Sequence, residues 1–319
     1  MQLATVIILF IVGIVFIIKG GDFFVDAASW IAEVSGVPKL IVGATVVSLA
    51  TTMPEMLVSV MAAAEGKVDM AIGNAVGSVT ANIGLIMAIS LICIPAAIKR
   101  RDYLLKSVCM LAATVLIVIS GLSGQVGLSA SVVLVAIFLI FLWENVSSAK
   151  RSMLEKHEQQ AERPKPERKE IVKNILLFII GAAGIIIGAD LLVDNGSELA
   201  RYIGISERII GVTVIAIGTS LPELITTITA IMKKESSLSV GNILGANIID
   251  LSLILPVSSL VSGKALPIAA TSAALDFPAC LLVGCVAVFP AMISERFRRW
   301  QGVLLLVIYV GYVYFTCVA

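Results

Sequence analysis

The sequence is poor in charge. Only 14% of its 319 residues are Asp, Glu, Lys or Arg, whereas 59% are hydrophobic. A soluble domain carries about 25% charged residues. The composition therefore excludes an ordinary soluble domain and predicts a polytopic membrane protein. The formal net charge of +1 also argues against a nucleic-acid partner, which would require a strongly basic surface.

The sequence has one histidine and no paired cysteines. His157 lies in a hydrophilic stretch, and no Cys-x-x-Cys spacing occurs. The apolar segments therefore lack the imidazole and thiolate pairs that bind zinc or copper, and we interpret the cysteines as packing residues. An intramembrane hydrolase is disfavoured because no apolar segment contains a histidine or a paired-aspartate motif. We expect no enzyme activity, no cofactor and no obligate protein partner.

Long apolar runs fill most of the chain. A helix that crosses a bilayer needs about 20 mostly apolar residues. Two further segments, 22–36 and 190–206, are interpreted as amphipathic extensions of the first and sixth spans. We therefore expect an all-α protein with ten transmembrane helices. The predicted spans are 2–18, 38–63, 69–98, 104–121, 126–147, 171–193, 209–232, 238–262, 268–290 and 301–318.

One hydrophilic segment, 148–170, divides the chain into a first half, 1–147, and a second half, 171–319. Each half has five predicted spans. With the N-terminus outside, 19 of the 23 Lys and Arg residues, Lys106 among them, are assigned to inner loops or the linker. Lys and Arg are enriched in cytoplasmic loops. We therefore expect both termini to be extracellular and the linker 148–170 to be cytoplasmic.

The two halves repeat each other at a constant offset of 168 positions. Because each half has an odd number of spans, the two copies must enter the membrane in opposite senses. Inverted repeats of this kind are common in secondary transporters, which bind substrate near mid-membrane where the repeats meet. The paired residues are Gly13/Gly181, Asp22/Asp190, Asp26/Asp194, Gly43/Gly211, Thr45/Thr213, Pro54/Pro222, Glu55/Glu223, Gly73/Gly241, Asn74/Asn242, Gly77/Gly245 and Asn82/Asp250.

A polar motif interrupts the second span and recurs in the seventh. Residues 48–55 read Ser-Leu-Ala-Thr-Thr-Met-Pro-Glu, and residues 216–223 read Ala-Ile-Gly-Thr-Ser-Leu-Pro-Glu. Proline has no amide hydrogen and displaces the carbonyl four residues earlier, so it bends or breaks a helix. A charged residue at bilayer depth costs about 2.5 kcal/mol or more and marks a functional site by default.

Oxygen donors surround each proline. The hydroxyls of Thr51 and Thr52 share a helical face with Glu55, because residues three and four apart are neighbours on a helix. The second motif places Thr219, Ser220 and Glu223 in the same way. Carboxylates, hydroxyls and carbonyls are the ligands that Ca²⁺ and other hard cations prefer. The paired motifs therefore predict a cation site.

The third and eighth spans carry a second pair of motifs. Residues 73–82 begin Gly-Asn-x-x-Gly and continue through Ser78 to Asn82. The copy at 241–250 begins in the same way but has Ala246 in place of Ser78 and Asp250 in place of Asn82. The glycine pairs predict close helix packing. Together with Glu55 and Glu223, Asp250 makes three carboxylates that cannot all stay ionised in a dry site without cations. Cation binding, or protonation in its place, is therefore expected.

These four motifs resemble the α-repeats of the cation/Ca²⁺ exchanger superfamily, and especially its prokaryotic Na⁺/Ca²⁺ exchanger branch. The resemblance extends over the whole ten-helix plan. It implies antiport of Ca²⁺ against several Na⁺ by alternating access in a prokaryotic plasma membrane, with these ions and the lipid bilayer as partners. The superfamily's H⁺/Ca²⁺ exchangers carry a Gly-Asn-x-x-Glu form of the glutamate motif, which is absent here.

The resemblance also assigns roles to residues. Four residues would hold Ca²⁺: Glu55, Glu223, Thr51 and Thr219. Na⁺ or water sites would be completed by the backbone carbonyls of Ser48 and Ala216 and by Thr52, Ser220, Ser78, Asn82 and Asp250.

The chain departs from the family pattern at several positions. Ala246 stands where the family commonly has a serine that matches Ser78, and Val79 replaces the asparagine present in its twin, Asn247. The loss of a hydroxyl at Ala246 removes a Na⁺ ligand. An H⁺-coupled or K⁺-dependent cation antiporter therefore remains an alternative. An ion channel is a further alternative, but the kinked two-fold plan suits alternating access better.

Overall fold

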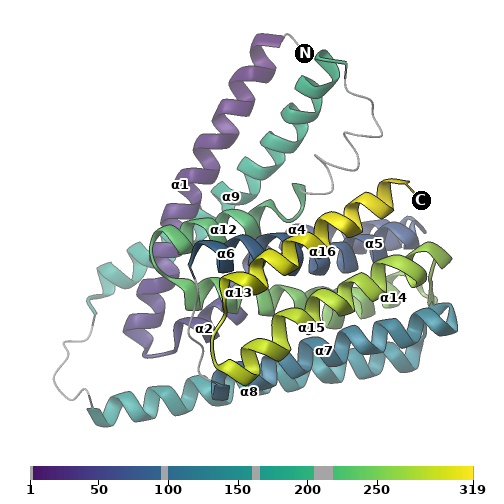
Figure 1. The fold of residues 1–319 in the computed structure, drawn as a ribbon. Helices are drawn as coiled ribbons and strands as arrows, with labels where there is room; N and C mark the ends of the chain where they lie inside the picture. The colour runs from purple at the N-terminus through teal and green to yellow at the C-terminus, as the bar shows by residue number, and fades with distance from the viewer. Residues whose placement is uncertain (1–2, 95–99, 160–165, 205–217, 319) are drawn as a thin grey trace.

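The computed structural model describes residues 3–94, 100–159, 166–204 and 218–318 and is almost entirely helical (Figure 1). Its one pair of described strands, β1 and β2, is only two residues long and joins Val126 to Leu266. The α-helices are α1 Leu3–Ser35, α2 Lys39–Val42, α3 Ser48–Thr51, α4 Met53–Ala64, α5 Val68–Ala81, α6 Ala88–Cys93, α7 Arg100–Ser123, α8 Leu128–Gln159, α9 Arg168–Tyr202, α12 Leu221–Met232, α13 Ser236–Ile249, α14 Leu255–Ser262, α15 Phe277–Ser294 and α16 Arg299–Val318. The π-helical turns are η1 Gly43–Val47, η2 Asn82–Met87, η4 Asp250–Ile254 and η5 Ser272–Asp276, and the strands are β1 Gln125–Val126 and β2 Leu266–Pro267.

The helices confirm a multi-pass membrane protein. Among the described residues, seven helices are long and apolar enough to cross a bilayer, and the pair Lys39–Thr51 and Met53–Ala64 forms an eighth span bent by 47°. The predicted seventh span is described only as the shorter helix α12, because its first part lies outside the described residues. The tenth corresponds to α16, which has 20 residues. The total of ten spans stays a prediction.

The boundaries of the central elements repeat at the same offset as the sequence. The helix α4 begins and ends 168 positions before α12, and α5 does so before α13. The π-turns η2 and η4 begin at the paired residues Asn82 and Asp250. Gly36 and Gly204 are another such pair, with φ of 76° and 83°. The sequence repeat therefore corresponds to a repeat of backbone structure.

Helices α1 and α9 lie side by side and project from the rest of the molecule (Figure 1). Helix α1 continues through residues 22–35 and α9 through residues 190–202, so the described parts of segments 22–36 and 190–206 extend the first and sixth spans as predicted. Residues 205 and 206 lie outside the described part of the chain. Glycines allow the close approach: a Cβ on Gly13 would meet the carbonyl of Gly188, and one on Gly181 would meet the carbonyl of Gly20. These two contacts exchange under the 168-residue offset, as a two-fold relation between the halves requires.

Helix α13 lies at the centre of the bundle. Every residue from Leu238 to Ile249 is buried. A Cβ on Gly241 would meet the backbone of Leu40 and Ala44, and one on Gly245 would meet Ala44 and Ser48. The predicted close packing of this glycine pair is therefore confirmed against α2, η1 and α3.

The equivalent glycines of α5 have no such contact with the described residues. A Cβ on Gly73 or Gly77 would have no described heavy atom within 4 Å. Residues 208–216, which correspond in the repeat to the segment that contacts Gly241 and Gly245, all lie outside the described part of the chain. The prediction of close packing at Gly73 and Gly77 therefore stays untested.

Lys106 corrects one sequence-based assignment. It was assigned to an inner loop, but it lies within α7 and is fully buried. Its Nζ atom is 2.8 Å from Oε2 of Glu144 on α8, and the hydroxyl of Ser148 donates to Oε1 of the same carboxylate at 2.7 Å. Burial is possible because this carboxylate neutralises the ammonium group. Helix α8 also continues to Gln159, through the first half of the expected linker 148–170.

Candidate functional site

The predicted proline break lies at the centre of the bent span. The helix ends at Thr51, Thr52 has φ −83° and ψ 0°, and α4 restarts at Met53 with Pro54 in its first turn. The second half has the same construction, with Ser220 at φ −87° and ψ 6° before α12. Because the proline ring cannot continue the preceding helix, the chain forms two half-helices at the first motif. At the second motif the described residues show the start of α12, and the segment before residue 218 lies outside them.

Each half-helix places a glutamate in its first turn. Glu55 lies in the first turn of α4 and Glu223 in the first turn of α12, where the positive end of the helix dipole favours a carboxylate. Both side chains are buried, at 1% and 0% exposure. The carboxylate of Glu55 interacts electrostatically with those of Glu223 and Asp250. The acidic residues that the sequence singled out are therefore buried and near enough for their charges to interact, although the three do not form a single metal-sized cluster among the described residues.

Several of these buried oxygens have no donor among the described residues. Within that part of the chain, both carboxylate oxygens of Glu55, both of Asp250 and Oε2 of Glu223 lack a hydrogen-bond partner. The hydroxyl of Ser220 also lacks one. A buried charge without a partner is strongly unfavourable. This arrangement fits a site whose missing partner is a cation, and such an ion would be transported substrate rather than a resident cofactor.

The hydroxyls of the first motif form a small network across the two halves. Thr51 donates to Oδ1 of Asn242 on α13 at 3.2 Å. Thr52 lies 3.4 Å from Oε1 of Glu223 and makes a shorter bond, 2.6 Å, to the carbonyl of Ser48. The Ser48 carbonyl accepts from the Thr52 amide as well. The backbone carbonyl of Ser48, which is predicted to be a ligand, already accepts hydrogen bonds within its own motif.

Asn82 and Asp250 occupy equivalent places at the ends of α5 and α13. Each begins a π-helical turn, a feature that is frequent at functional sites because it widens the helix and re-aims side chains. Both side chains are buried. Oδ1 of Asn82 also lacks a hydrogen-bond partner. The neutral and acidic members of this pair therefore both present free oxygens.

The remaining predicted residues differ in how they are placed. Ser78 is buried on α5, and Ala246, its counterpart, is buried on α13 without a hydroxyl. Thr219 is half-buried at the start of the second motif. Ala216, predicted to offer its carbonyl, lies outside the described residues.

Sequence reasoning missed three asparagines as contributors to this region. Asn74 donates to the carbonyl of Glu55 at 3.1 Å and so supports the first turn of α4. Asn242 accepts from Thr51, and Asn247 accepts from Nδ2 of Asn82 at 3.2 Å. Asn74 and Asn242 stand in the repeated Gly-Asn motif, so the sequence contains a signal for them, but the sequence analysis assigns a role only to the glycines of that motif.

The oxygen donors do not form a dense acidic cluster. Within the described ranges, no group of three or more His, Cys, Asp or Glu side chains lies close enough to hold a metal ion. A cation here would therefore need hydroxyl, amide and carbonyl ligands as well, which suits Ca²⁺ and Na⁺ better than a transition metal.

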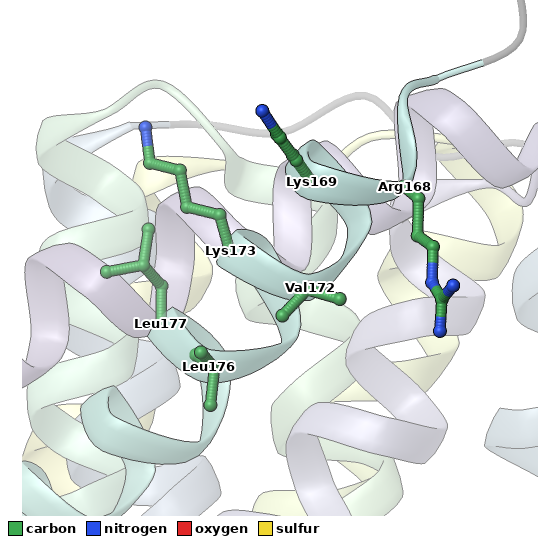
Figure 2. Close-up of a pocket in the computed structure, with 6 residues that line it drawn as sticks. All are labelled: Arg168, Lys169, Val172, Lys173, Leu176 and Leu177. Atoms are coloured by element: carbon green, nitrogen blue, oxygen red, sulfur yellow. The ribbon is translucent and has the colours of Figure 1, made fainter.

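A surface hollow lies apart from this site, along the first turns of α9. Figure 2 shows its lining, in which three basic side chains lie beside apolar ones. Two of the lining residues, Arg168 and Lys169, lie at the end of the predicted linker, and the other four begin the predicted sixth span; none carries a carboxylate. The hollow therefore offers no cation ligands. Its lining residues are Arg168, Lys169, Val172, Lys173, Leu176 and Leu177.

Comparison with known proteins identifies the family. The family model for the sodium/calcium exchanger protein matches residues 5–146 and 173–318, which together make up most of the chain. The chain belongs to the sodium/calcium exchanger family. The expected resemblance to the cation/Ca²⁺ exchanger superfamily is thus confirmed, and the members of this family are exchangers rather than enzymes.

Individual relatives cover nearly the full length of this exchanger-family chain. It is 34% identical over 319 residues to the inner membrane protein YrbG of Escherichia coli, with 96% of this chain and 94% of that protein covered. It is 28% identical to the sodium/calcium exchanger MaX1 of Methanosarcina acetivorans, with 96% of each covered. A solved structure of the sodium-calcium exchanger NCX_Mj aligns with a TM-score of 0.82 at 28% identity, over 98% of this chain and 99% of that one. These archaeal and bacterial relatives confirm the prokaryotic branch.

Proposed function

We propose that this protein is a secondary antiporter that exchanges Ca²⁺ for Na⁺ across a prokaryotic plasma membrane. The observation that carries the proposal is the pair of buried glutamates, Glu55 and Glu223, on the first turns of two half-helices. Their unpartnered oxygens give a transported cation a place to bind. Membership of the sodium/calcium exchanger family supports the choice of ions.

The site suits competition between two kinds of cation. One Ca²⁺ placed between Glu55 and Glu223 neutralises two carboxylates, and hydroxyls such as Thr51 and Thr219 complete its oxygen shell. Na⁺ brings one charge, so several Na⁺ are needed to replace one Ca²⁺ and satisfy the same carboxylates together with Asp250. Because an empty site leaves these charges unpaired, exchange of one cation for the other is favoured over release without replacement.

Alternating access would follow from the repeat. The halves meet at the site through contacts such as Thr51 with Asn242 and Thr52 with Glu223. Rocking of one repeat or helix pair against the other around a fixed mid-membrane site is the usual motion of inverted-repeat transporters. The two long helices α1 and α9, which pack mainly on each other, are the part of the molecule best placed to slide.

Ca²⁺ flux under imposed gradients tests the proposal. The protein is reconstituted into liposomes loaded with Na⁺ and diluted into Na⁺-free medium that contains radioactive Ca²⁺. We expect Ca²⁺ uptake that follows the size of the outward Na⁺ gradient and stops when the gradient is collapsed. Liposomes without protein provide the background.

The same liposomes separate the alternatives. Ca²⁺ uptake that does not respond to a Na⁺ gradient but follows a pH gradient would show coupling to H⁺ instead of Na⁺. Ca²⁺ uptake that also requires K⁺ would indicate a K⁺-dependent exchanger. Ca²⁺ uptake that needs no counter-ion at all would indicate a channel. Each of these results would contradict the proposed exchange of Ca²⁺ for Na⁺ alone.

A further inference from the structure

Asn247 is a fully buried amide that has no counterpart in the first half of the chain. It lies on α13, and the residue 168 positions earlier is Val79. Its Oδ1 accepts a hydrogen bond from Nδ2 of Asn82 at 3.2 Å. Its own Nδ2 donates to Sδ of Met110, on α7, at 3.7 Å. The three side chains therefore form a chain of two hydrogen bonds that ends at the candidate cation site.

The direction of this hydrogen-bonded chain is set by Met110. A thioether sulfur accepts hydrogen bonds but has no hydrogen to donate. Asn247 must therefore turn its NH₂ group toward Met110 and its oxygen toward Asn82. Asn82 in turn uses its NH₂ group on Asn247, and its oxygen is left as a buried acceptor without a protein donor.

The orientation of Asn82 decides whether it attracts or repels a cation. An amide has an oxygen at one end and two N–H donors at the other, and a rotation of 180° exchanges them. Only the oxygen end is a cation ligand. Without an acceptor at position 247, the hydrogen bond that fixes the NH₂ group of Asn82 is lost, and nothing in that bond would oppose the rotation that turns the N–H donors toward the cation.

The repeat explains why this device occurs once. Asp250 stands where the second copy of Asn82 would be, and a carboxylate presents oxygen at both ends, so it needs no orienting neighbour. Val79, which the repeat makes the counterpart of Asn247, is apolar and buried. The neutral ligand has an orienting asparagine and the acidic ligand has a valine. The difference between Val79 and Asn247 therefore matches the difference between Asp250 and Asn82, because only the neutral amide needs an orienting neighbour.

We propose that Asn247, held by Met110, is a positioning residue that keeps the Asn82 side-chain oxygen turned toward the transported cation. Asn247 itself touches no ion. The inference rests on the proposed function, because it assumes that the site binds Na⁺ and Ca²⁺.

Equilibrium binding tests this role. Purified protein binds radioactive Ca²⁺, and the Na⁺ concentration that displaces half of it is measured. In Asn247→Val, we expect this concentration to rise about tenfold, the equivalent of losing one hydrogen bond. In Asn82→Asp/Asn247→Val, which copies the Asp250 and Val79 arrangement, we expect displacement to return to within about threefold of wild type, because a carboxylate needs no orientation.

The double variant distinguishes positioning from simple support of the fold. Asn145→Val is the matched control, because Asn145 is also buried but bonds only the carbonyl of Phe141 among the described contacts. It should lower thermal stability without changing Na⁺ displacement. Met110→Leu, which removes the sulfur and keeps the bulk, should raise the Na⁺ requirement about twofold and serves if Asn247→Val does not fold.

The inference would be overturned if Asn247→Val or Met110→Leu left the Na⁺ concentration for displacement unchanged. It would also be overturned if the double variant Asn82→Asp/Asn247→Val did not restore the wild-type value. A wild-type protein that binds Ca²⁺ but whose Ca²⁺ is not displaced by Na⁺ would instead refute the proposed exchange itself. The two failures are therefore distinguishable in one set of titrations.

Discussion

At the scale of single residues, the two halves of the site have equivalent positions but different ligands. Glu55 and Glu223 are equivalent in helix position and burial. The counterpart of Ser78 in the repeat is Ala246, which has no side-chain oxygen. Na⁺ binding depends on the number of oxygen ligands, so one side of the site is expected to hold Na⁺ less well than the other.

Ala246→Ser tests this asymmetry. The added hydroxyl restores the ligand that Ser78 has in the other half, and we expect the Na⁺ concentration for half-maximal Ca²⁺ exchange to fall about threefold to tenfold, as one added oxygen ligand is comparable to a hydrogen bond to a charged group. Ala246→Cys, which adds one heavy atom at the same place but a soft sulfur instead of an oxygen, is the control. An unchanged Na⁺ dependence in Ala246→Ser would show that this position does not contribute to the Na⁺ site.

At the scale of helices, glycine brings the backbones of α13 and the bent span into contact. A Cβ at position 241 would overlap the carbonyl oxygen of Leu40, and backbone cannot move aside as a side chain can. Asn242, which accepts the hydrogen bond from Thr51, is the next residue in the chain and depends on the same approach. The glycines of α13 therefore position the ligands as well as the helices.

Gly241→Ala should destabilise the protein by about 1 to 3 kcal/mol, the usual cost of overpacking, and should weaken Ca²⁺ binding because the two helices are forced apart. Thermal unfolding in detergent and Ca²⁺ binding measure the two effects. Gly311→Ala is the control, since a Cβ there would meet no described atom within 4 Å. Equal stability of the two variants would contradict the close packing of α13.

The ion pair between Lys106 and Glu144 holds α7 to α8. Removing one partner leaves an uncompensated buried charge, so Lys106→Met should cost about 3 to 5 kcal/mol of stability. Lys106→Met/Glu144→Leu removes both charges and should recover most of that loss. Lys67→Met breaks an exposed pair with Glu65 and should change little. Thermal unfolding compares the variants, and a double variant no better than Lys106→Met would contradict the account.

At the scale of the whole molecule, the orientation in the membrane rests on the distribution of Lys and Arg. We expect alkaline phosphatase, which is active only outside the cytoplasm of a bacterium, to be active when fused after residue 319 and inactive when fused within the linker at residue 160. Green fluorescent protein at the same two points should give the opposite pattern. Phosphatase activity at the linker would reverse the predicted topology.

Much of this organisation could be predicted from the sequence because it depends on local chemistry. Pro54 and Pro222 break their helices wherever they lie, and a constant offset of 168 fixes which elements correspond. The buried carboxylates followed from their position inside apolar runs. The boundaries of α4 and α12, and of α5 and α13, then agree at that offset.

Other features depend on contacts between distant segments and could not be predicted in this way. Lys106 lies near the start of a span, where a charged residue usually reaches the membrane surface, and only its pairing with Glu144 on another helix explains its burial. Asn247 differs from Val79 in the sequence, but its role requires Met110, more than a hundred residues away. No local pattern contains that information.

The central claim is that Glu55 and Glu223 together hold the transported Ca²⁺. It is tested most directly by Na⁺-driven Ca²⁺ uptake into liposomes with Glu55→Gln, Glu223→Gln and the control Glu65→Gln, whose glutamate is exposed and paired with Lys67. At equal protein incorporation, we expect uptake to fall to the protein-free background in the first two variants and to remain at the wild-type level in the third. Near-normal uptake in either Glu55→Gln or Glu223→Gln would contradict the account.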